Sequence, residues 1–423
     1  MKHHIPIFFG LLLALGLALM FTAPVFADDA PPPEQPAAPE AAAPPAPEGG
    51  GESGGEAEAP VEALTSGAPD PLAIAGGDLG ILGPPWAYYY VGTTLVERDQ
   101  PQDLINNILE TGILPSNRMI YLQQGTFNGF EIDGGAGSGI LSQLKGLLGN
   151  GDYPNPVANF TGYNNEDASV INSGGVEVHH TTAGFLLQGL NVTGGNVYLH
   201  DNVGTLTIKS LDVGNGCETL VEDHNGAISV DSLTVSGAGG AILDNTDSAS
   251  AGVTILNSAF RNNSNVGGDA MGLAIYTRGL AKLSGIDAFQ NQATGLHIEA
   301  LKGIELYNAY SAENGGHGVE IISTAAAKVT VKDLQTHTNG DDGLHIETLG
   351  DILLTQIAAS NNGQNNDGFG NFGFGINIST WPQTPGGRNL VGMDLGAWDN
   401  HDTGLDLKVS GSATLSGLFT SNN

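Results

Sequence analysis

The sequence has few charged residues for its length, and very few of them are positive. Charged residues make up 14% of the 423 residues, and 13 basic against 45 acidic side chains give a formal net charge of −32. A surface this acidic repels phosphate backbones and anionic lipids, so the composition argues against nucleic-acid binding. The low charge content also argues against a helical bundle or coiled coil, which is rich in Glu, Lys, Ala and Leu.

Cysteine and long apolar runs are nearly absent as well. Cys217 is the only cysteine, so no disulfide can form within the chain. The one long apolar run, residues 5–21, follows a basic start and precedes small residues that end at Ala27. This pattern is typical of a signal peptide over residues 1–27, and a retained membrane anchor is the alternative. We expect a secreted, extracellular or cell-surface protein with no membrane span after signal cleavage.

Lysine and arginine do not occur in residues 28–85, which consist largely of Pro, Ala, Glu and Gly. Alanine and proline bury too little apolar surface to offset the entropy of ordering the chain. We therefore predict a disordered acidic linker over residues 28–85 and a folded domain over residues 86–423.

Glycine is abundant, with 63 residues, and the second half of the chain repeats. Apolar residues stand five and eight positions before each of a set of asparagines, with Gly392 as the exception. The asparagines are Asn291, Asn314, Asn339, Asn362, Asn400 and Asn423. Alternating strands begin at Leu273, Leu296, Val319 and Leu344, at spacings of 23, 23 and 25 residues. A constant period with variable turns is typical of a solenoid, and alternation of period two indicates strands.

These repeats favour a parallel β-helix, in which strands of successive coils pair about 4.8 Å apart. Inward apolar residues then stack into columns that form one continuous core. The asparagines would lie at a turn, where their side-chain amides hydrogen-bond along the solenoid axis. We expect the turn glycines to relieve backbone positions of positive φ.

The repeat of Asn, two to four residues, Gly and Leu-x-Ile covers residues 272–423, and looser copies lie upstream at 184–193 and 206–211. It resembles the right-handed parallel β-helix proteins of the pectate-lyase-like superfamily. Residues 102–109 and 120–127 are similar to the opening helix and first strand of that family. The resemblance implies an all-β, single-stranded right-handed parallel β-helix with a short N-terminal capping helix. The fold carries lyases, hydrolases, epimerases and non-enzymatic surface proteins, so it does not select an activity.

Register between coils predicts two outward rows of side chains on the repeated strands. The first row contains His297, Glu320 and His345 as vertical neighbours, and Glu299 and Glu347 flank them in the second row. A histidine between carboxylates has a raised pKa and suits general acid–base catalysis, so we take His297, Glu320 and His345 as candidate catalytic residues. The cluster also suits a divalent metal, or simply a solvated face with alternating charge.

Turn residues suggest two further kinds of site. Asp341, Asp342 and Asp402 carry oxygens of the type that calcium prefers, so calcium is the cofactor to test. Trp381, with Glu299 and Glu347, is a candidate for sugar binding. The strings Gly316-His317-Gly318 and Gly340-Asp341-Asp342 are similar to polygalacturonase motifs, but their order is reversed and no Arg-x-Lys follows. We interpret both as turn residues.

Two functions therefore stay open. The first is a secreted or surface-displayed module that binds polysaccharide or another cell-surface component, in an adhesive or structural role. The alternative is a polysaccharide lyase or glycoside hydrolase. The repeat reaches Asn423 without an amphipathic cap, which would leave strand edges unpaired. We therefore expect either that the natural chain continues or that another molecule covers the end, for example by end-to-end self-association.

Overall fold

A computed structural model describes residues 86–136, 139–149, 169–264, 270–363, 373–380 and 387–423. The predicted signal peptide over 1–27 and the predicted linker over 28–85 lie outside these residues, and both stay predictions. No helix within the described ranges is long and apolar enough to cross a membrane.

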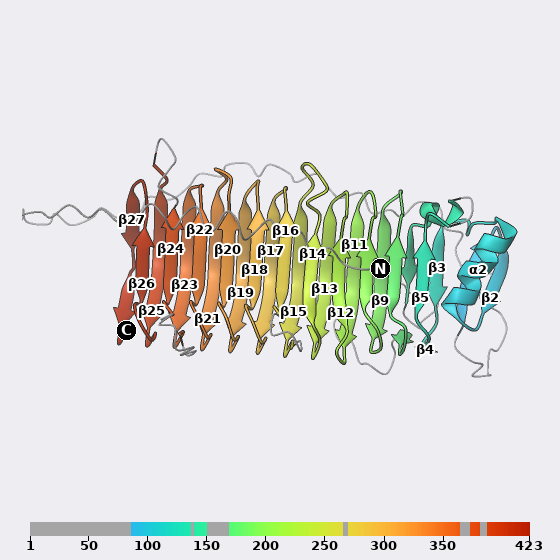
Figure 1. Cartoon of the computed structure of the whole chain (residues 1–423), viewed down its shortest axis with the longest axis horizontal. Coiled ribbons are helices and arrows are strands. Elements are labelled where there is room, and N and C mark those ends of the chain that lie inside the picture. Colours follow the sequence, from blue (N-terminus) through green and yellow to red (C-terminus); the bar gives the residue numbers. More distant parts are fainter. Residues whose placement is uncertain (1–85, 137–138, 150–168, 265–269, 364–372, 381–386) are drawn as a thin grey trace, which may run out of the picture. The chain divides into compact units, whose positions relative to one another are not determined.

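The chain forms a parallel β-helix, as the repeat predicts (Figure 1). Each regular coil contributes one short strand to an 11-stranded sheet and one longer strand to a 17-stranded sheet. Each strand pairs in parallel with its equivalents in neighbouring coils, as in the register of β18 with β20 and of β19 with β21. The strands of the 11-stranded sheet are β5(Phe130–Asp133), β8(Val176–His179), β10(Val197–His200), β12(Glu218–Glu222), β14(Gly240–Asp244), β16(Leu273–Thr277), β18(Leu296–Ala300), β20(Val319–Ser323), β22(Leu344–Thr348), β24(Ile376–Thr380) and β26(Leu405–Lys408).

The longer strands are bent in the middle. The fifth residue of most nine-residue strands has a positive φ, for example Asn308 (φ 55°), Asp333 (φ 56°) and Gln356 (φ 56°). A left-handed residue at a fixed position turns each strand by the same amount, so the bends stack. The longer strands are β9(Phe185–Val192), β11(Leu206–Gly214), β13(Ile228–Ser236), β15(Val253–Arg261), β17(Ala281–Phe289), β19(Ile304–Ala312), β21(Val329–His337), β23(Ile352–Ser360) and β25(Leu390–Trp398). In the last coil two short strands, β27(Ala413–Ser416) and β28(Phe419–Ser421), pair with β25 in place of one long strand.

The N-terminal part of the domain begins with an antiparallel hairpin that the sequence analysis did not predict. It consists of β1(Ala87–Val91) and β2(Thr94–Arg98), and β1 also pairs with β3(Met119–Leu122). The expected helix is present as α2(Pro101–Thr111), which buries Leu104, Ile105 and Ile108 in the same core as the coils. The remaining elements are β4(Gly125–Phe127), the 3-10 helix η2(Ile140–Gln143), β6(Gly146–Leu148) and β7(Ser169–Ile171).

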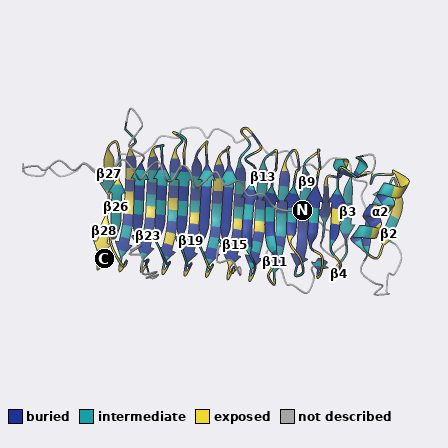
Figure 2. Ribbon diagram, viewed as in Figure 1, coloured by how far each residue is buried: buried dark blue, intermediate teal, exposed yellow. Residues whose placement is uncertain are grey.

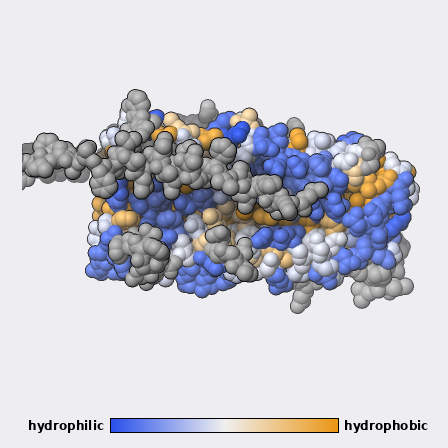
Figure 3. Space-filling model, viewed as in Figure 1, coloured by the Kyte–Doolittle hydropathy of each residue, from blue (hydrophilic) through white to orange (hydrophobic). Residues whose placement is uncertain are grey.

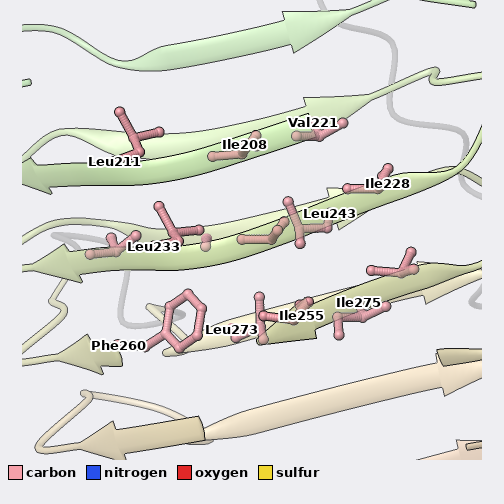
Figure 4. Packing of buried hydrophobic residues seen from close by; sticks show 14 of the residues in the cluster. Ile208, Leu211, Val221, Ile228, Leu233, Leu243, Ile255, Phe260, Leu273 and Ile275 are labelled. Atoms are coloured by element: carbon pink, nitrogen blue, oxygen red, sulfur yellow. The ribbon is translucent and has the colours of Figure 1, made fainter. Parts of the chain in front are cut away.

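Inward side chains form one continuous core along the solenoid (Figure 2). Val221, Leu243 and Ile275 occupy one register position on consecutive coils, and Leu211 stacks on Leu233 in the opposite sheet (Figure 4). Each fully buried aliphatic side chain contributes about 1.5–3 kcal/mol, and every coil adds several. Hydrophilic residues cover much of the outer surface in Figure 3.

The asparagine column is confirmed, and it is longer by one residue than predicted. The Nδ2 of Asn291 donates to Oδ1 of Asn314 at 2.8 Å, and the backbone N–H of Asn291 donates to the same oxygen at 3.0 Å. This double contact repeats from coil to coil through Asn400 and Asn423, and it starts at Asn263. The column satisfies buried amides that would otherwise destabilise each turn.

The expectation for the turn glycines holds for some of them, such as Gly216, Gly237 and Gly303, which have positive φ. The glycines that lead into the short strands from β16 onward do not; there, left-handed residues immediately precede the column asparagines, such as Glu313 and Thr338. Glycine is required for space: a Cβ on Gly318 would lie 2.6 Å from Asn339 Nδ2. The same close approach recurs at Gly272, Gly295, Gly343, Gly375 and Gly404.

Candidate functional site

The predicted outward rows lie on the 11-stranded sheet. His297 pairs with Glu320, Glu320 with His345, and His345 with Asn377, so the first row has the predicted order. Glu299 pairs with Ile322 in the second row. The predicted alternation of inward and outward residues along the short strands is therefore confirmed, and the side chains of both rows point away from the core.

Side-chain contacts join two of the three candidate catalytic residues and separate the third, His345, from them. His297 Nδ1 lies 2.8 Å from Glu320 Oε2, and both side chains are largely buried. His345 turns instead toward the preceding turn, where its Nδ1 donates to Asp342 Oδ2 at 2.9 Å. The second ring nitrogen, Nε2, lies 3.5 Å from Glu347 Oε1. The structure thus joins His345 to a carboxylate that we had interpreted as a turn residue.

Asp342 is the most constrained carboxylate of this group. Its Oδ1 accepts the backbone N–H of Phe374 at 2.8 Å, and its Oδ2 accepts Asn377 Nδ2 at 2.9 Å in addition to His345. The His317 ring stacks on the His345 ring, with centroids 4.9 Å apart, and His317 Nδ1 lies 3.8 Å from Asp342 Oδ2. We call His317, Asp342, His345 and Asn377 the His345 cluster.

Electrostatics favour the ion-pair form of the cluster. Burial alone would lower the pKa of His345, but the hydrogen bond to Asp342 and the charges of Asp342, Glu347 and Glu320 raise it above 6.5. Burial would raise the pKa of Asp342, but hydrogen bonds and His317 lower it. The hydrogen bond from His297 is the main reason why the pKa of Glu320 is lowered. The shift at His345 has the direction expected for a histidine between carboxylates.

These shifts predict how stability depends on pH. The pKa of His345 is raised on folding, so its contribution is fully present below its unfolded value of about 6.5 and is lost as pH rises through the folded value. Asp342 contributes in the opposite sense: its share is present above about pH 4 and is lost as pH falls through its lowered pKa.

We expect an NMR titration to give a His345 pKa above 6.5. In urea denaturation, His345→Gln should remove the part of the wild-type stability that declines above neutral pH. Equal pH profiles for wild type and His345→Gln would contradict the assignment.

The other predicted site residues are dispersed. Trp381 lies outside the described residues. Asp342 belongs to the His345 cluster, whereas Asp341 and Asp402 are in none of the groups of close His and acidic ligand atoms found in the described part of the chain. The grouping around Asp342 therefore contains two imidazoles, a donor set closer to that of zinc than of calcium.

Sequence reasoning missed the partners of His345, although a signal was present. His317 and Asp342 stand 25 residues apart, and each lies two positions before the first residue of a short strand, Val319 or Leu344. Residues at equivalent turn positions stack from coil to coil in the same way as residues in strands. The same register argument that gives the outward rows therefore predicts that His317 and Asp342 are neighbours. A second histidine-rich group, on β5, β8 and β10, was also missed because the coils there differ in length.

Comparisons with known proteins found a weak structural likeness. No family model matches the chain, and no curated protein matches it. Among solved structures, the chain is similar to the crystal structure of a mutant of the periplasmic alginate epimerase AlgG. The identity is 10%, the TM-score is 0.25, and the match covers 74% of this chain and 87% of that chain. A likeness of this extent carries no information about function. The evidence for the β-helix is the parallel register of its strands.

Proposed function

We propose that this protein is an exported β-helix module that binds a polysaccharide along the outer face of its 11-stranded sheet. The observation that supports the proposal is the composition of the two outward rows. Rings and carboxylates lie close together there: Tyr198 stacks on His200 at 4.1 Å beside Glu177 and Glu222 of the neighbouring coils, and the partly exposed Tyr276 lies against the buried His297 at 5.4 Å between ring centroids. Carboxylates bind sugar hydroxyls, and aromatic rings pack on the apolar faces of sugars.

The repeat of the face favours a polymer as the ligand. Register pairing places outward side chains at steps of about 4.8 Å along the sheet, a regular spacing that suits a chain of repeated units. The strong negative charge favours a neutral polysaccharide, or an acidic one bridged by calcium.

A polysaccharide-binding assay tests this proposal. We expect the full chain to co-sediment with at least one polysaccharide from a panel of neutral and acidic polymers, with calcium or with EDTA. Tyr276→Ala should weaken binding about tenfold, because ring packing contributes about 1.5 kcal/mol. Tyr307→Ala is the matched control, since Tyr307 is a partly exposed tyrosine on the 17-stranded sheet. No binding to any polymer, or an equal loss in both variants, would contradict the proposal.

The His345 cluster supports a second candidate function, acid–base cleavage of the bound polysaccharide. Asp342 fixes the ring so that Nδ1–H is donated and Nε2 is left to exchange a proton with a substrate. The same panel, followed for new reducing ends and for unsaturated products, tests a hydrolase and a lyase respectively. Product that forms with wild type but not with His345→Gln would support catalysis at this cluster.

A further inference from the structure

A second group of histidines and carboxylates lies on the same sheet, toward its N-terminal end. Asp133 ends β5, His179 ends β8, and His180 follows in the turn; His179 pairs in register with Asp133. The side chain of His179 is 10% exposed, that of Asp133 31% and that of His180 50%. None of these residues belongs to the His345 cluster or to the proposed sugar-binding rings.

Three ligand atoms of this group converge on one point. His180 Nδ1 lies 2.9 Å from His179 Nδ1 and 2.9 Å from Asp133 Oδ1, and the last two atoms are 3.6 Å apart. The circle through three atoms with these separations has a radius of about 1.9 Å, so an ion at the usual zinc distances of about 2.0–2.1 Å from each fits just above their plane.

The hydrogen bonds around the group fix the lone pairs in the required direction. His179 Nε2 lies 3.0 Å from Glu131 Oε1, so this ring donates Nε2–H and presents the Nδ1 lone pair to His180 and Asp133. A carboxylate behind a ligating imidazole is the usual outer shell of a zinc histidine. His180 Nδ1 can carry a single N–H, and this N–H cannot form a well-aligned hydrogen bond with both His179 Nδ1 and Asp133 Oδ1. A cation bound between the three atoms would interact favourably with all of them.

The backbone leaves space for such an ion. Gly135 follows Asp133 by two residues and donates its N–H to Asp133 Oδ1 at 2.7 Å. A Cβ at this position would lie 3.1 Å from Asp133 Oδ1 and 3.3 Å from His180 Nδ1. Glycine therefore keeps the approach to these two ligand atoms open.

We propose that Asp133, His179 and His180 bind a divalent transition metal ion, Zn²⁺ by preference, with Glu131 as the outer-shell partner of His179. Two imidazoles and one carboxylate form a donor set that zinc prefers over calcium or magnesium. Three protein ligands leave a fourth position on the exposed side of His180 for water or a ligand oxygen. The proposal does not require the polysaccharide function, although His179 stacks on His200, one of the proposed sugar-binding rings.

Zinc titration of the full chain by calorimetry tests this site. The titration uses a His345→Gln background, which removes the His317–Asp342–His345 group as a competing site. We expect one Zn²⁺ to bind. His180→Asn and Asp133→Asn should each weaken binding by about 100-fold or more. Asn suits residue 180 because φ is 57° there, a conformation that asparagine tolerates.

Asp201→Asn is the matched control, because Asp201 holds the equivalent left-handed turn position of the next coil (φ 52°) and ligates nothing in this proposal. It should keep zinc affinity within about threefold of the parent. Zinc should also raise the melting temperature of the parent and of Asp201→Asn, but not that of His180→Asn. The proposal is overturned if the parent binds no zinc or if His180→Asn binds as tightly. Loss of binding in His200→Ala with retention in His180→Asn would equally overturn it, because the Glu177–His179–His200 group would then hold the ion.

Discussion

Leu306→Asp should prevent folding of the β-helix. Leu306 is fully buried, and it pairs in register with Leu283 on one side and Val331 on the other. The substitution loses about 2–3 kcal/mol of apolar burial and places a carboxylate between two coils without a partner, at a further cost of several kcal/mol. The sum approaches the whole stability of an ordinary domain. We expect insoluble protein, or no cooperative transition in urea followed by circular dichroism.

Leu353→Asp is the matched control for this change. Leu353 is the second residue of β23 and points outward between buried Ile352 and Leu354. The same substitution there should change the unfolding free energy by less than about 1 kcal/mol. His317→Ala, in a turn, should also leave the fold intact. Comparable damage from Leu306→Asp and Leu353→Asp would mean that the inward and outward assignment is wrong.

Gly318→Ala should destabilise the asparagine column strongly, although it adds a single methyl group. The new Cβ would lie 2.6 Å from Asn339 Nδ2 and 2.6 Å from the carbonyl oxygen of Gly343, far inside van der Waals contact. Neither atom can yield, because Asn339 Nδ2 donates to Asn362 Oδ1 at 2.9 Å and the carbonyl of Gly343 accepts the N–H of Val319 at 3.0 Å. We expect a loss of about 3 kcal/mol, measured by urea denaturation.

The matched control is Gly214→Ala at the end of β11. A Cβ at this position meets no atom closer than the carbonyl oxygen of Ser236 at 3.5 Å, which is ordinary contact, and its φ is not positive. Gly214→Ala should therefore be neutral, or slightly stabilising because alanine restricts the unfolded chain. If both variants have the same stability as wild type, the close packing at the column is not as the structure has it.

The fold was predictable because a solenoid is nearly one-dimensional. Alternation along Leu296–Ala300 and the equivalent segments gives the inward and outward faces, and the coil period gives the register. Together they predict that His297, Glu320 and His345 lie on consecutive strands, as they do. The hairpin of β1 and β2 was not predictable in this way, since it occurs once and has no repeat to compare with.

The sequence by itself determined the coil period, the apolar columns, the asparagine column and the outward rows, because each depends only on spacing along the chain. The tertiary structure decided which neighbours those outward side chains contact. His345 lies beside Glu320 in register, yet its ring turns to Asp342 in the preceding turn. Asp133 and His180 meet across 47 residues, a separation that matches no coil period. Contacts of this kind depend on side-chain rotation and on the paths of turns of unequal length, and neither follows from a period.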